Sequence, residues 1–411
     1  MSTVILSINA GSSSLKTTLY AYGDEKKLRS LAKAEVSNIN SQPAQLKYSS
    51  SAKQDKKDVD NVSDHKAAFE HVLKSFLEDE SVKEVKNKDD IRYACHRVVQ
   101  GGDFEEDQLI TKETFHKIEA LEDLAPLHNK SAVDLMVACH EHLPNVANVA
   151  CFDSGFHHTM PDHVRAYMID QRIAKEKGLR KYGFHGLSYS YITRAVAGFL
   201  DKPPEDTSMI ALHLGSGASI CAIRNGKSID TTMGLTPVSG LPGGTRSGDI
   251  DPALIFHYTS DASKLSPSST KELHISTAEE ILNKRSGWKA VAGTSDFAEI
   301  AKKDAPASHR LALDIFVDRI VGYVGSYYVK LGGDIDALVF AGGIGEKSAL
   351  LRKMVIEKIA CLGFSMDDKK NEQLDGDGPV YGIGEHNKRK TLVCETDEDY
   401  EMAYNSMMHP K

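Results

Sequence analysis

The sequence predicts an α/β protein of two similar domains with a cleft between them. In "SINAGSSSLK" (7–16) an apolar run ends in a turn of small residues, and "TTLY" (17–20) continues as a second strand. The same strand–turn–strand pattern returns in "MIALHLGSGASICAIRNGK" (209–227). A third apolar strand, in "ALVFAGGIGEKSALLRKM" (337–354), ends in glycines and runs into a helical pattern. Ligands in α/β folds gather at the carboxyl ends of strands, so these three loops predict a binding site.

The first of these turns differs from a P-loop. A P-loop has a glycine directly before its lysine and a helix after it. Here Leu15 precedes Lys16, and the residues that follow favour a strand. The turn therefore presents backbone N–H groups and hydroxyls, which suit either a phosphate-binding nest or an ordinary hairpin turn.

The composition describes an ordinary globular protein. The chain has 411 residues, of which 41% are hydrophobic and 26% charged, so its length suggests two or three domains. A formal net charge of −8 argues against a nucleic-acid or membrane partner. The six cysteines form no C-x-x-C pair, so neither a zinc site nor a disulfide framework is indicated. Several lie in apolar runs, which indicates buried thiols in a reducing compartment. An apolar strand begins almost at once and no apolar run is long enough to span a membrane, so we expect a cytoplasmic protein.

Other segments complete the expected order of elements. The polar, poorly periodic stretch 41–66 suggests an exposed excursion, and a helical pattern of apolar residues is expected from there to about residue 90. Buried strands are expected within 91–102 and 145–161. "STAEEIL" (276–282) reads as a helix start with a capping box.

Two arginines and three histidines are candidates for chemistry. Arg97 and Arg246 lie in short glycine-flanked stretches, and guanidinium groups grip carboxylate or phosphate with paired donors. A surface arginine or a structural ion pair is the ordinary alternative. His128, His185 and His213 are more often structural than catalytic, although His185 lies in an apolar setting bounded by glycines.

The acidic candidates have structural alternatives as well. Asp153 ends a predicted strand. In "TDEDYEM" (396–402) we expect Thr396 to cap a helix, and the acids that follow would favour its N-terminal dipole. The functional alternative is that one of these carboxylates helps to hold Mg²⁺, which needs few protein oxygens beside water and phosphate.

Nine stretches taken together resemble the acetate kinase family. They lie in one order from residue 9 to residue 399, which makes the combination far more specific than any single stretch. They are "NAGSSSLK", "HRVVQGG", "APLHN", "FDSGFHHTMP", "YGFHGLS", "HLGSGAS", "GLPGGTRSGDIDP", "FAGGIGE" and "TDED".

The resemblance implies duplicated ribonuclease H-like domains, as in the actin-like ATPases, that close on a nucleotide. The first domain would span 1–152 and be completed by the C-terminal helix, at about 386–411. The second, nucleotide-binding domain would span 153–385. The family also implies a homodimer.

Site residues follow from the resemblance one by one. Arg97 matches the substrate-binding arginine and Asp153 the active-site acid, while His185 and Arg246 match the groups that stabilise the transition state. Asn9 and Glu398 match the magnesium site. The small acyl pocket corresponds to Val99, Leu127, Phe184 and Pro237. The nucleotide-binding positions correspond to Lys16, His213, Leu214, Gly215, Ser216, Gly217, Asp296, Phe297, Gly343, Ile344, Gly345 and Glu346.

Three departures concern the phosphoryl donor. The family usually has Asn where Ser216 stands, Arg where Ala298 stands and Asn where Lys347 stands. The acyl and phosphoryl-transfer positions match throughout.

The resemblance predicts the reaction acetate + ATP ⇌ acetyl phosphate + ADP, with Mg²⁺. Two sibling activities stay open, a propionate or butyrate kinase and an acetate kinase that uses pyrophosphate. An actin- or Hsp70-like ATPase is the alternative from another class, since fold does not imply function. Such ATPases have no need for two arginines aimed at a carboxylate.

Overall fold

The structure, a computed structural model, describes residues 2–408 except 12, 24, 26, 40, 42, 124–128, 270–273 and 386–388. The chain divides into two compact units. The first unit consists of Met1–Gly155 and Asp397–Lys411, and the second of Phe156–Thr396. Asp153 and Glu398 therefore both belong to the first unit.

The first unit is built on an eight-stranded sheet with the order β5-β4-β3-β2-β1-β6-β8-β7. Strands β1 to β5 pair antiparallel, β1, β6 and β8 pair parallel, and β7 is antiparallel to β8. The strands are β1 Thr3–Ala10, β2 Ser14–Tyr22, β3 Leu28–Ser37, β4 Ala44–Ser50, β5 Gln54–Val59, β6 Ile91–Val98, β7 Gln108–Leu109 and β8 Ala147–Phe152.

The second unit is built on a six-stranded sheet with the order β11-β10-β9-β12-β14-β13. Its strands are β9 Met209–Leu214, β10 Ala218–Arg224, β11 Lys227–Thr231, β12 Ala337–Ala341, β13 Val380–Gly382 and β14 Lys390–Cys394. Strand β9 pairs antiparallel with β10 and parallel with β12, and β12 pairs parallel with β14.

The two sheets share one core topology. In each, an antiparallel three-strand meander is followed by two parallel strands, as β3-β2-β1-β6-β8 and as β11-β10-β9-β12-β14. The β1–β2 and β9–β10 hairpins occupy equivalent places, and their turns are the two small-residue loops of the sequence. This confirms the predicted duplication and the α/β class.

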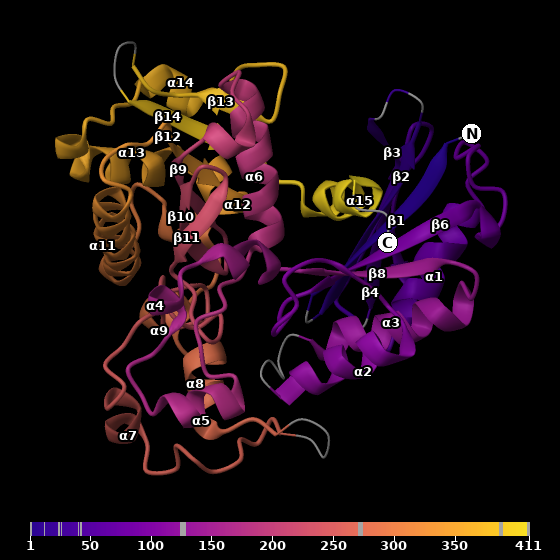
Figure 1. Cartoon of the computed structure of the whole chain (residues 1–411), viewed down its shortest axis with the longest axis horizontal. Coiled ribbons are helices and arrows are strands. Elements are labelled where there is room, and N and C mark those ends of the chain that lie inside the picture. The colour runs from indigo at the N-terminus through magenta and orange to yellow at the C-terminus, as the bar shows by residue number, and fades with distance from the viewer. Residues whose placement is uncertain are drawn as a thin grey trace. The chain divides into compact units, whose positions relative to one another are not determined.

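Helices cover both faces of each sheet (Figure 1). In the first unit, α1 and α3 pack on one face, and their buried apolar residues join those of β1 and β2 in one core. Helix α15 packs against β1 and β6 on the other face. The helices are α1 His65–Leu77, α2 Lys112–Ala120, α3 Lys130–His142 and α15 Glu398–Met408.

In the second unit, α11 and α13 share a core with one face of the sheet, and α6 covers the other face. Each unit therefore contains the helix that follows the other unit's sheet in the chain. Helix α6 follows β8 of the first sheet but belongs to the second unit, and α15 follows β14 of the second sheet but belongs to the first unit. The helices are α4 Asp162–Arg165, α5 Gln171–Lys177, α6 Gly186–Phe199, α7 Leu254–Tyr258, α8 Thr277–Lys284, α9 Gly287–Ala292, α10 Phe297–Ile300, α11 Ala307–Lys330, α12 Gly342–Lys347, α13 Ala349–Lys358 and α14 Asp368–Glu372.

Successive side chains of the first hairpin point to opposite faces of the sheet, so one face is apolar and joins the core while the other is polar. Leu6 and Ile8 of β1 are buried against α1 and α3, so the intervening Ser7 and Asn9 point to the other face. There Ser7 Oγ donates to the backbone oxygen of Asp399 at 2.7 Å. The polar residues of this hairpin therefore face α15.

The expectation of an exposed excursion at 41–66 is wrong. Residues 44–50 and 54–59 form β4 and β5, which extend the first sheet to its edge. Ala44, Leu46 and Tyr48 are buried, while the residues between them are polar. One face of β4 thus packs on the core and the other carries polar side chains. The average hydrophobicity of the segment is therefore low, although it forms a strand.

The six cysteines are free thiols, and five of them are buried, as the sequence indicated; Cys361 is exposed. The capping box at Ser276 and Glu279 is also confirmed. Within the part of the chain that the structure describes, no helix is both long and apolar enough to cross a bilayer.

Two buried histidines are expected to make the fold acid-sensitive. Burial lowers the pKa of His96 and of His157 to about 4 each. Their pKa in the unfolded chain is about 6.5, so the unfolded chain binds more protons between these values. The contribution of these histidines to the free energy of unfolding is therefore fully present above about pH 6.5. As the pH drops toward 4, each histidine lowers the free energy of unfolding by about 1.4 kcal/mol per pH unit.

Variants His96→Gln and His157→Gln should each flatten this acid dependence, measured as the urea midpoint at pH 7 and at pH 5. His116→Gln is the control, because the His116 side chain is 60% exposed. If the urea midpoint of both variants fell between pH 7 and pH 5 by as much as that of the unmodified protein, the acid sensitivity would not come from these histidines.

Candidate functional site

Arg97, at the end of β6, is the centre of a polar cluster in the first unit. Its Nε donates to Asp153 Oδ1 at 3.1 Å, and its Nη2 donates to Asp153 Oδ2 at 2.7 Å. Its Nη1 donates to Asn9 Oδ1 at 3.2 Å and lies 3.2 Å from Glu398 Oε2. Asn9 Nδ2 also donates to Glu398 Oε2, at 3.3 Å. The structure thus brings four predicted site residues together, from β1, β6, the end of β8 and the start of α15.

The electrostatics of this cluster keep Arg97 charged. Burial alone disfavours the guanidinium charge, but Asp153 and Glu398 more than offset it and raise the pKa of Arg97 above its usual range. The Asp153 side chain is only 1% exposed, so its carboxylate faces Arg97 rather than solvent. This geometry makes Asp153 the residue that orients Arg97.

The start of α15 differs from the prediction in one residue. Asp397, not Thr396, caps the helix, because Asp397 Oδ1 accepts from Tyr400 N at 2.8 Å. The Thr396 hydroxyl instead donates to Glu346 Oε1 at 3.2 Å. Because Asp397 is the cap, Glu398 is the first residue of the helix, and its side chain lies near Arg97.

The first hairpin turn is held by backbone and side-chain bonds. Gly11 N donates to Ser14 O at 2.8 Å, and His65 Nε2 lies 2.8 Å from Gly11 O. A carbonyl oxygen only accepts, so this ring nitrogen carries the proton. Lys16 pairs with Asn9 across the hairpin, and its exposed side chain therefore lies on the same face.

The loop after β6 is fixed by a buried asparagine. Val99 leads into this loop and is half-buried. Asn129 Oδ1 accepts from Gln100 N at 3.0 Å, and Asn129 Nδ2 donates to Gln100 O at 2.9 Å. Asn129 is fully buried, so this two-way bond holds the position of Val99. Sequence reasoning gave Asn129 no role.

His185 is the centre of a second cluster, in the second unit. Its backbone is left-handed, with φ of 62°, directly before α6. Such a conformation costs a non-glycine residue about 1–3 kcal/mol and is enriched at functional sites. His185 Nδ1 lies 2.8 Å from Ser219 Oγ, which in turn lies 2.6 Å from the Tyr189 hydroxyl. The His185 ring stacks on His213 at 4.2 Å between centroids.

Arg246 lies beside Gly217, in the turn between β9 and β10, as His185 does. A Cβ built on Gly217 would lie 2.9 Å from Arg246 Nη1 and 3.8 Å from His185 Nε2. Two side chains that can donate to a phosphoryl oxygen therefore lie against Gly217, which has no side chain of its own in the way. The structure brings His185, His213, Gly217 and Arg246 together, as predicted.

Backbone bonds hold the Arg246 loop. Gly243 N donates to Arg246 O at 3.0 Å, and Gly244 N donates to Ser216 O at 2.8 Å. Ser286 N and Trp288 N, at the start of α9, donate to Thr245 O and Gly243 O. The loop is thus tied to both the β9–β10 turn and α9.

The third loop, α12, packs against the β9–β10 turn. Gly342 has φ of 73°, and a Cβ there would lie 2.8 Å from Leu214 O, so only glycine fits. The Glu346 carboxylate accepts from Thr396 N at 3.1 Å, and burial raises its pKa. Glu346 therefore holds the chain after β14. Residues Gly343, Ile344 and Gly345 form the rest of this helix.

A buried arginine that sequence reasoning missed supports α12. Arg352, on α13, is 2% exposed. Its Nη1 donates to the carbonyls of Gly345 and Glu346, both at 2.8 Å, and its Nε donates to Asn371 Oδ1 at 2.7 Å. Since its partners are mostly carbonyls from elsewhere in the unit, no local sequence pattern could have indicated the role.

The two residues expected near the adenosine have structural roles. Asp296 caps α10 by accepting from Ala298 N at 2.9 Å. Phe297 packs edge-on against Trp288 and Phe316 in the core of the second unit. Asp296 is exposed and Phe297 is buried, so of the two only Asp296 is available to a ligand.

The predicted acyl-pocket residues are distributed over both units. Phe184 and Pro237 are buried in the second unit, Val99 lies in the first, and Leu127 lies outside the described residues, as does His128. Sequence reasoning also missed His157, whose Nε2 donates to Phe184 O at 3.0 Å and so supports the approach to α6.

The donor set around Arg97 fits magnesium. Asn9 and Glu398 offer amide and carboxylate oxygens on one face, which are the hard ligands that Mg²⁺ takes beside water and phosphate. Among the described residues, no three His, Cys, Asp or Glu side chains gather as a metal site.

Comparisons with known proteins agree with this arrangement. The sequence model of the acetokinase family matches residues 4–404. A probable acetate kinase of Emericella nidulans is 56% identical over 98% of this chain and 96% of its own length. A propionate kinase structure from Francisella tularensis superposes with a TM-score of 0.86 at 34% identity, covering 98% of each chain. The acetate kinase structure from Porphyromonas gingivalis superposes with a TM-score of 0.85 at 34% identity, covering all of both chains. The two duplicated sheets and the match over nearly the whole chain lead to one conclusion: the chain belongs to the acetokinase family.

Proposed function

We propose that this acetate kinase transfers the γ-phosphoryl group of ATP to acetate, reversibly and with Mg²⁺, through the two clusters described above. The observation that carries the assignment of the site is the contact of Arg97 with Asn9, Asp153 and Glu398. The transition state of phosphoryl transfer is loose and spreads charge over its oxygens, so positioning and electrostatics do most of the work.

In the first unit, Arg97 would bind the acetate carboxylate. Asp153 takes one side of the guanidinium and fixes its plane, which supports a positioning role for Asp153. A carboxylate nucleophile is already ionised at neutral pH, so the reaction needs no strong general base.

In the second unit, His185 and Arg246 would donate to the transferring phosphoryl group. Their proximity to Gly217 supports this role, because the glycine lets phosphate oxygens approach the backbone. His185 Nδ1 lies 2.8 Å from Ser219 Oγ, and when Nδ1 accepts from this hydroxyl the ring proton is on Nε2, which can then donate to a phosphoryl oxygen.

Asn9 and Glu398 would hold Mg²⁺, which neutralises charge on the phosphate oxygens when bound. Lys16, on the same face as Asn9, would meet the nucleotide phosphates. The loops at His213–Gly217 and α12, together with exposed Asp296, would bind the rest of the nucleotide.

One assay tests the function and separates it from its alternatives. Purified protein is given acetate and Mg²⁺ with either ATP or pyrophosphate, and acetyl phosphate is trapped as the hydroxamate. We expect acetyl phosphate from ATP. Faster formation from pyrophosphate would overturn the donor, and ATP hydrolysis without any acetyl phosphate would point to an actin- or Hsp70-like ATPase.

Replacing Glu398 separates a metal role from a helix-start role. Glu398→Gln should raise the Mg²⁺ concentration needed for half-maximal rate, because it removes a charged oxygen ligand. Asp397→Ala is the matched control: it removes the α15 cap, and should lower stability by about 1 kcal/mol without changing the Mg²⁺ dependence. A magnesium titration and a melting curve are recorded for both. An unchanged Mg²⁺ dependence in Glu398→Gln would place the metal elsewhere.

Acyl length is expected to depend on Val99. The similarity to a propionate kinase makes longer acids relevant. Val99→Ala should improve propionate relative to acetate by about tenfold, since one methylene is worth about 1–3 kcal/mol of discrimination. Ratios of kcat/KM for the two acids decide this. An unchanged ratio would place Val99 outside the pocket.

A cytoplasmic homodimer is also part of the proposal. Free buried thiols support a reducing compartment. Exposed apolar residues in two segments of the second unit support an interface with a second copy. They are Met168, Ile169, Ile173, Leu254, Phe256, Tyr258 and Leu265. Analytical ultracentrifugation measures whether the mass in solution is that of two chains.

A further inference from the structure

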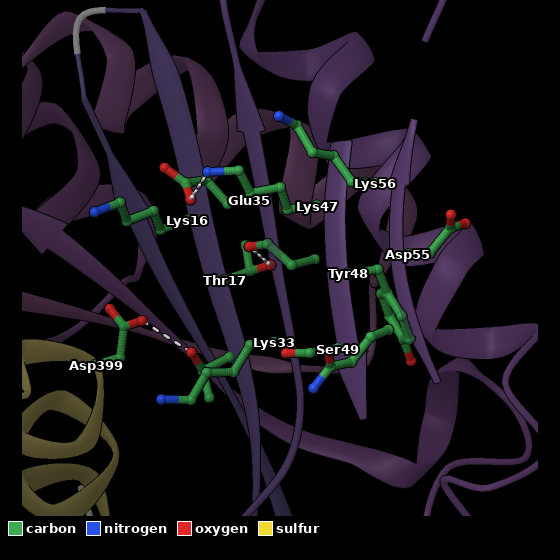
Figure 2. A pocket seen from close by; sticks show the side chains of 13 residues that line it. Lys16, Thr17, Lys33, Glu35, Lys47, Tyr48, Ser49, Asp55, Lys56 and Asp399 are labelled. Atoms are coloured by element: carbon green, nitrogen blue, oxygen red, sulfur yellow. Dashed lines mark hydrogen bonds and ion pairs between the residues drawn. The ribbon is translucent and has the colours of Figure 1, made fainter. Parts of the chain in front are cut away.

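A row of charged side chains crosses the outer strands of the first sheet, on the same face as Asn9. Along this row Asn9 is paired with Lys16, Lys16 with Glu35, Glu35 with Lys47, and Lys47 with Lys56. Residues paired across neighbouring strands point to one face, so these side chains share one surface. Figure 2 shows Lys16, Glu35, Lys47 and Lys56 on neighbouring strands.

A second row lies beside the first, and both line a hollow. In the second row Thr18 is paired with Lys33, Lys33 with Ser49, and Ser49 with Gln54. The hollow has a volume of about 550 Å³, within the range of about 300–1,000 Å³ that small-molecule sites occupy. Asp399 lines one end of it.

The positive charge in this hollow is only partly compensated. Glu35 lies 3.8 Å from Lys47, Asp399 accepts from Thr18 at 2.9 Å, and Asp55 pairs with Lys57. Asp399 also interacts electrostatically with Lys33. Among the described residues, no carboxylate forms an ion pair with Lys16 or Lys56. Lysine is common on edge strands, where it discourages aggregation. Lys16 and Lys33, however, lie on β2 and β3, away from the edge strand β5.

Lys47 and Lys56 are paired across β4 and β5, and like charges in such a pair cost stability; Glu35 offsets the charge of Lys47 only. Adjacent strands are about 4.8 Å apart, so one phosphate group fits between these two side chains. Lys16 and Lys33 lie two and one strand spacings from β4, about 10 and 5 Å away. Hydroxyls of Thr18 and Ser49 lie among the four lysines.

We propose that this hollow binds a small anion with two or more phosphate groups. Lysine ammonium groups act as point charges for phosphate oxygens, and the hollow has no arginine fork suited to a carboxylate. The Asp399 carboxylate repels an anion at its own end, so the phosphates lie toward β4 and β5. Because Lys16 also belongs to the proposed nucleotide site, the inference extends the proposed function: the bound anion raises the KM for ATP and leaves kcat unchanged.

The probe is inorganic tripolyphosphate, titrated into the full-length protein by calorimetry without nucleotide or Mg²⁺. The double variant Lys47→Gln/Lys56→Gln should bind it at least tenfold more weakly. Lys74→Gln is the control, since Lys74 lies on α1 with a 71% exposed side chain and does not line the hollow; it should bind as the unmodified protein does. Arg246→Ala should also bind normally, because Arg246 belongs to the other cluster.

If tripolyphosphate does not bind, or if the double variant binds it with unchanged affinity, the proposal is overturned. These lysines would then serve only to discourage aggregation at the edge of the sheet. Binding lost in Arg246→Ala alone would overturn it by placing the anion at the nucleotide loops. Citrate bound as tightly as tripolyphosphate would overturn the assignment to phosphate. The double variant should still make acetyl phosphate from acetate and ATP at saturating concentrations, so a failure of this site is distinct from a failure of the proposed function.

Discussion

Replacing Arg97 by alanine is expected to abolish turnover and to destabilise the first unit. The acetate carboxylate would lose its paired donors, which costs about 3 kcal/mol or more, a hundredfold or greater loss in kcat/KM for acetate. The buried Asp153 carboxylate would also lose its charge partner, and breaking a buried pair typically costs about 3–5 kcal/mol. Steady-state kinetics and urea unfolding measure the two effects.

Arg97→Lys distinguishes these two roles. Lysine can still place a positive charge near Asp153, so much of the stability should return, but it cannot make the two-pronged grip and activity should stay low. Arg92→Ala, an exposed arginine on the same strand, should change neither property. Near-normal turnover in Arg97→Ala would remove Arg97 from the reaction.

Arg246→Ala is expected to lower kcat by about a hundredfold or more with little loss of stability. Its guanidinium lies beside Gly217, where it would draw charge from the phosphoryl group. The loop itself is held by backbone bonds that the substitution leaves intact, such as Gly243 N to Arg246 O. The fold should therefore tolerate the change while the chemistry does not.

The measurement is kcat and KM for ATP and acetate beside a melting curve. Arg172→Ala serves as the control, because Arg172 is an arginine of the same unit whose side chain is 75% exposed. A variant that keeps kcat and loses only ATP affinity would restrict Arg246 to ground-state binding.

The sequence predicted the hairpins well because their turns are marked locally. An apolar run before Asn9 and small residues after it require little knowledge of the rest of the chain. The strand β4 carried a signal that was overlooked, since Ala44, Leu46 and Tyr48 alternate with polar residues. Most of β5 is exposed and charged, so periodicity alone could not have indicated it.

The site was predicted less completely than the fold. Arg97, at the end of β6, and Arg246, in a loop, both have glycines nearby in the sequence, and the family resemblance singled them out. The supporting residues Asn129, His157 and Arg352 hydrogen-bond to backbone groups of other segments. Such contacts depend on tertiary packing, which a single sequence does not display.

A double-mutant cycle between Arg97 and Arg246 tests the central claim most directly. The claim is that a cluster in each unit acts on one phosphoryl transfer between ATP and acetate. kcat/KM is measured for Arg97→Gln, Arg246→Gln and the double variant, with all three shown to be folded by melting curves. Groups that act as a unit are strongly non-additive, so the double variant should lose far less than the product of the two single losses. A loss equal to that product, or near-normal turnover in either single variant, would contradict the account.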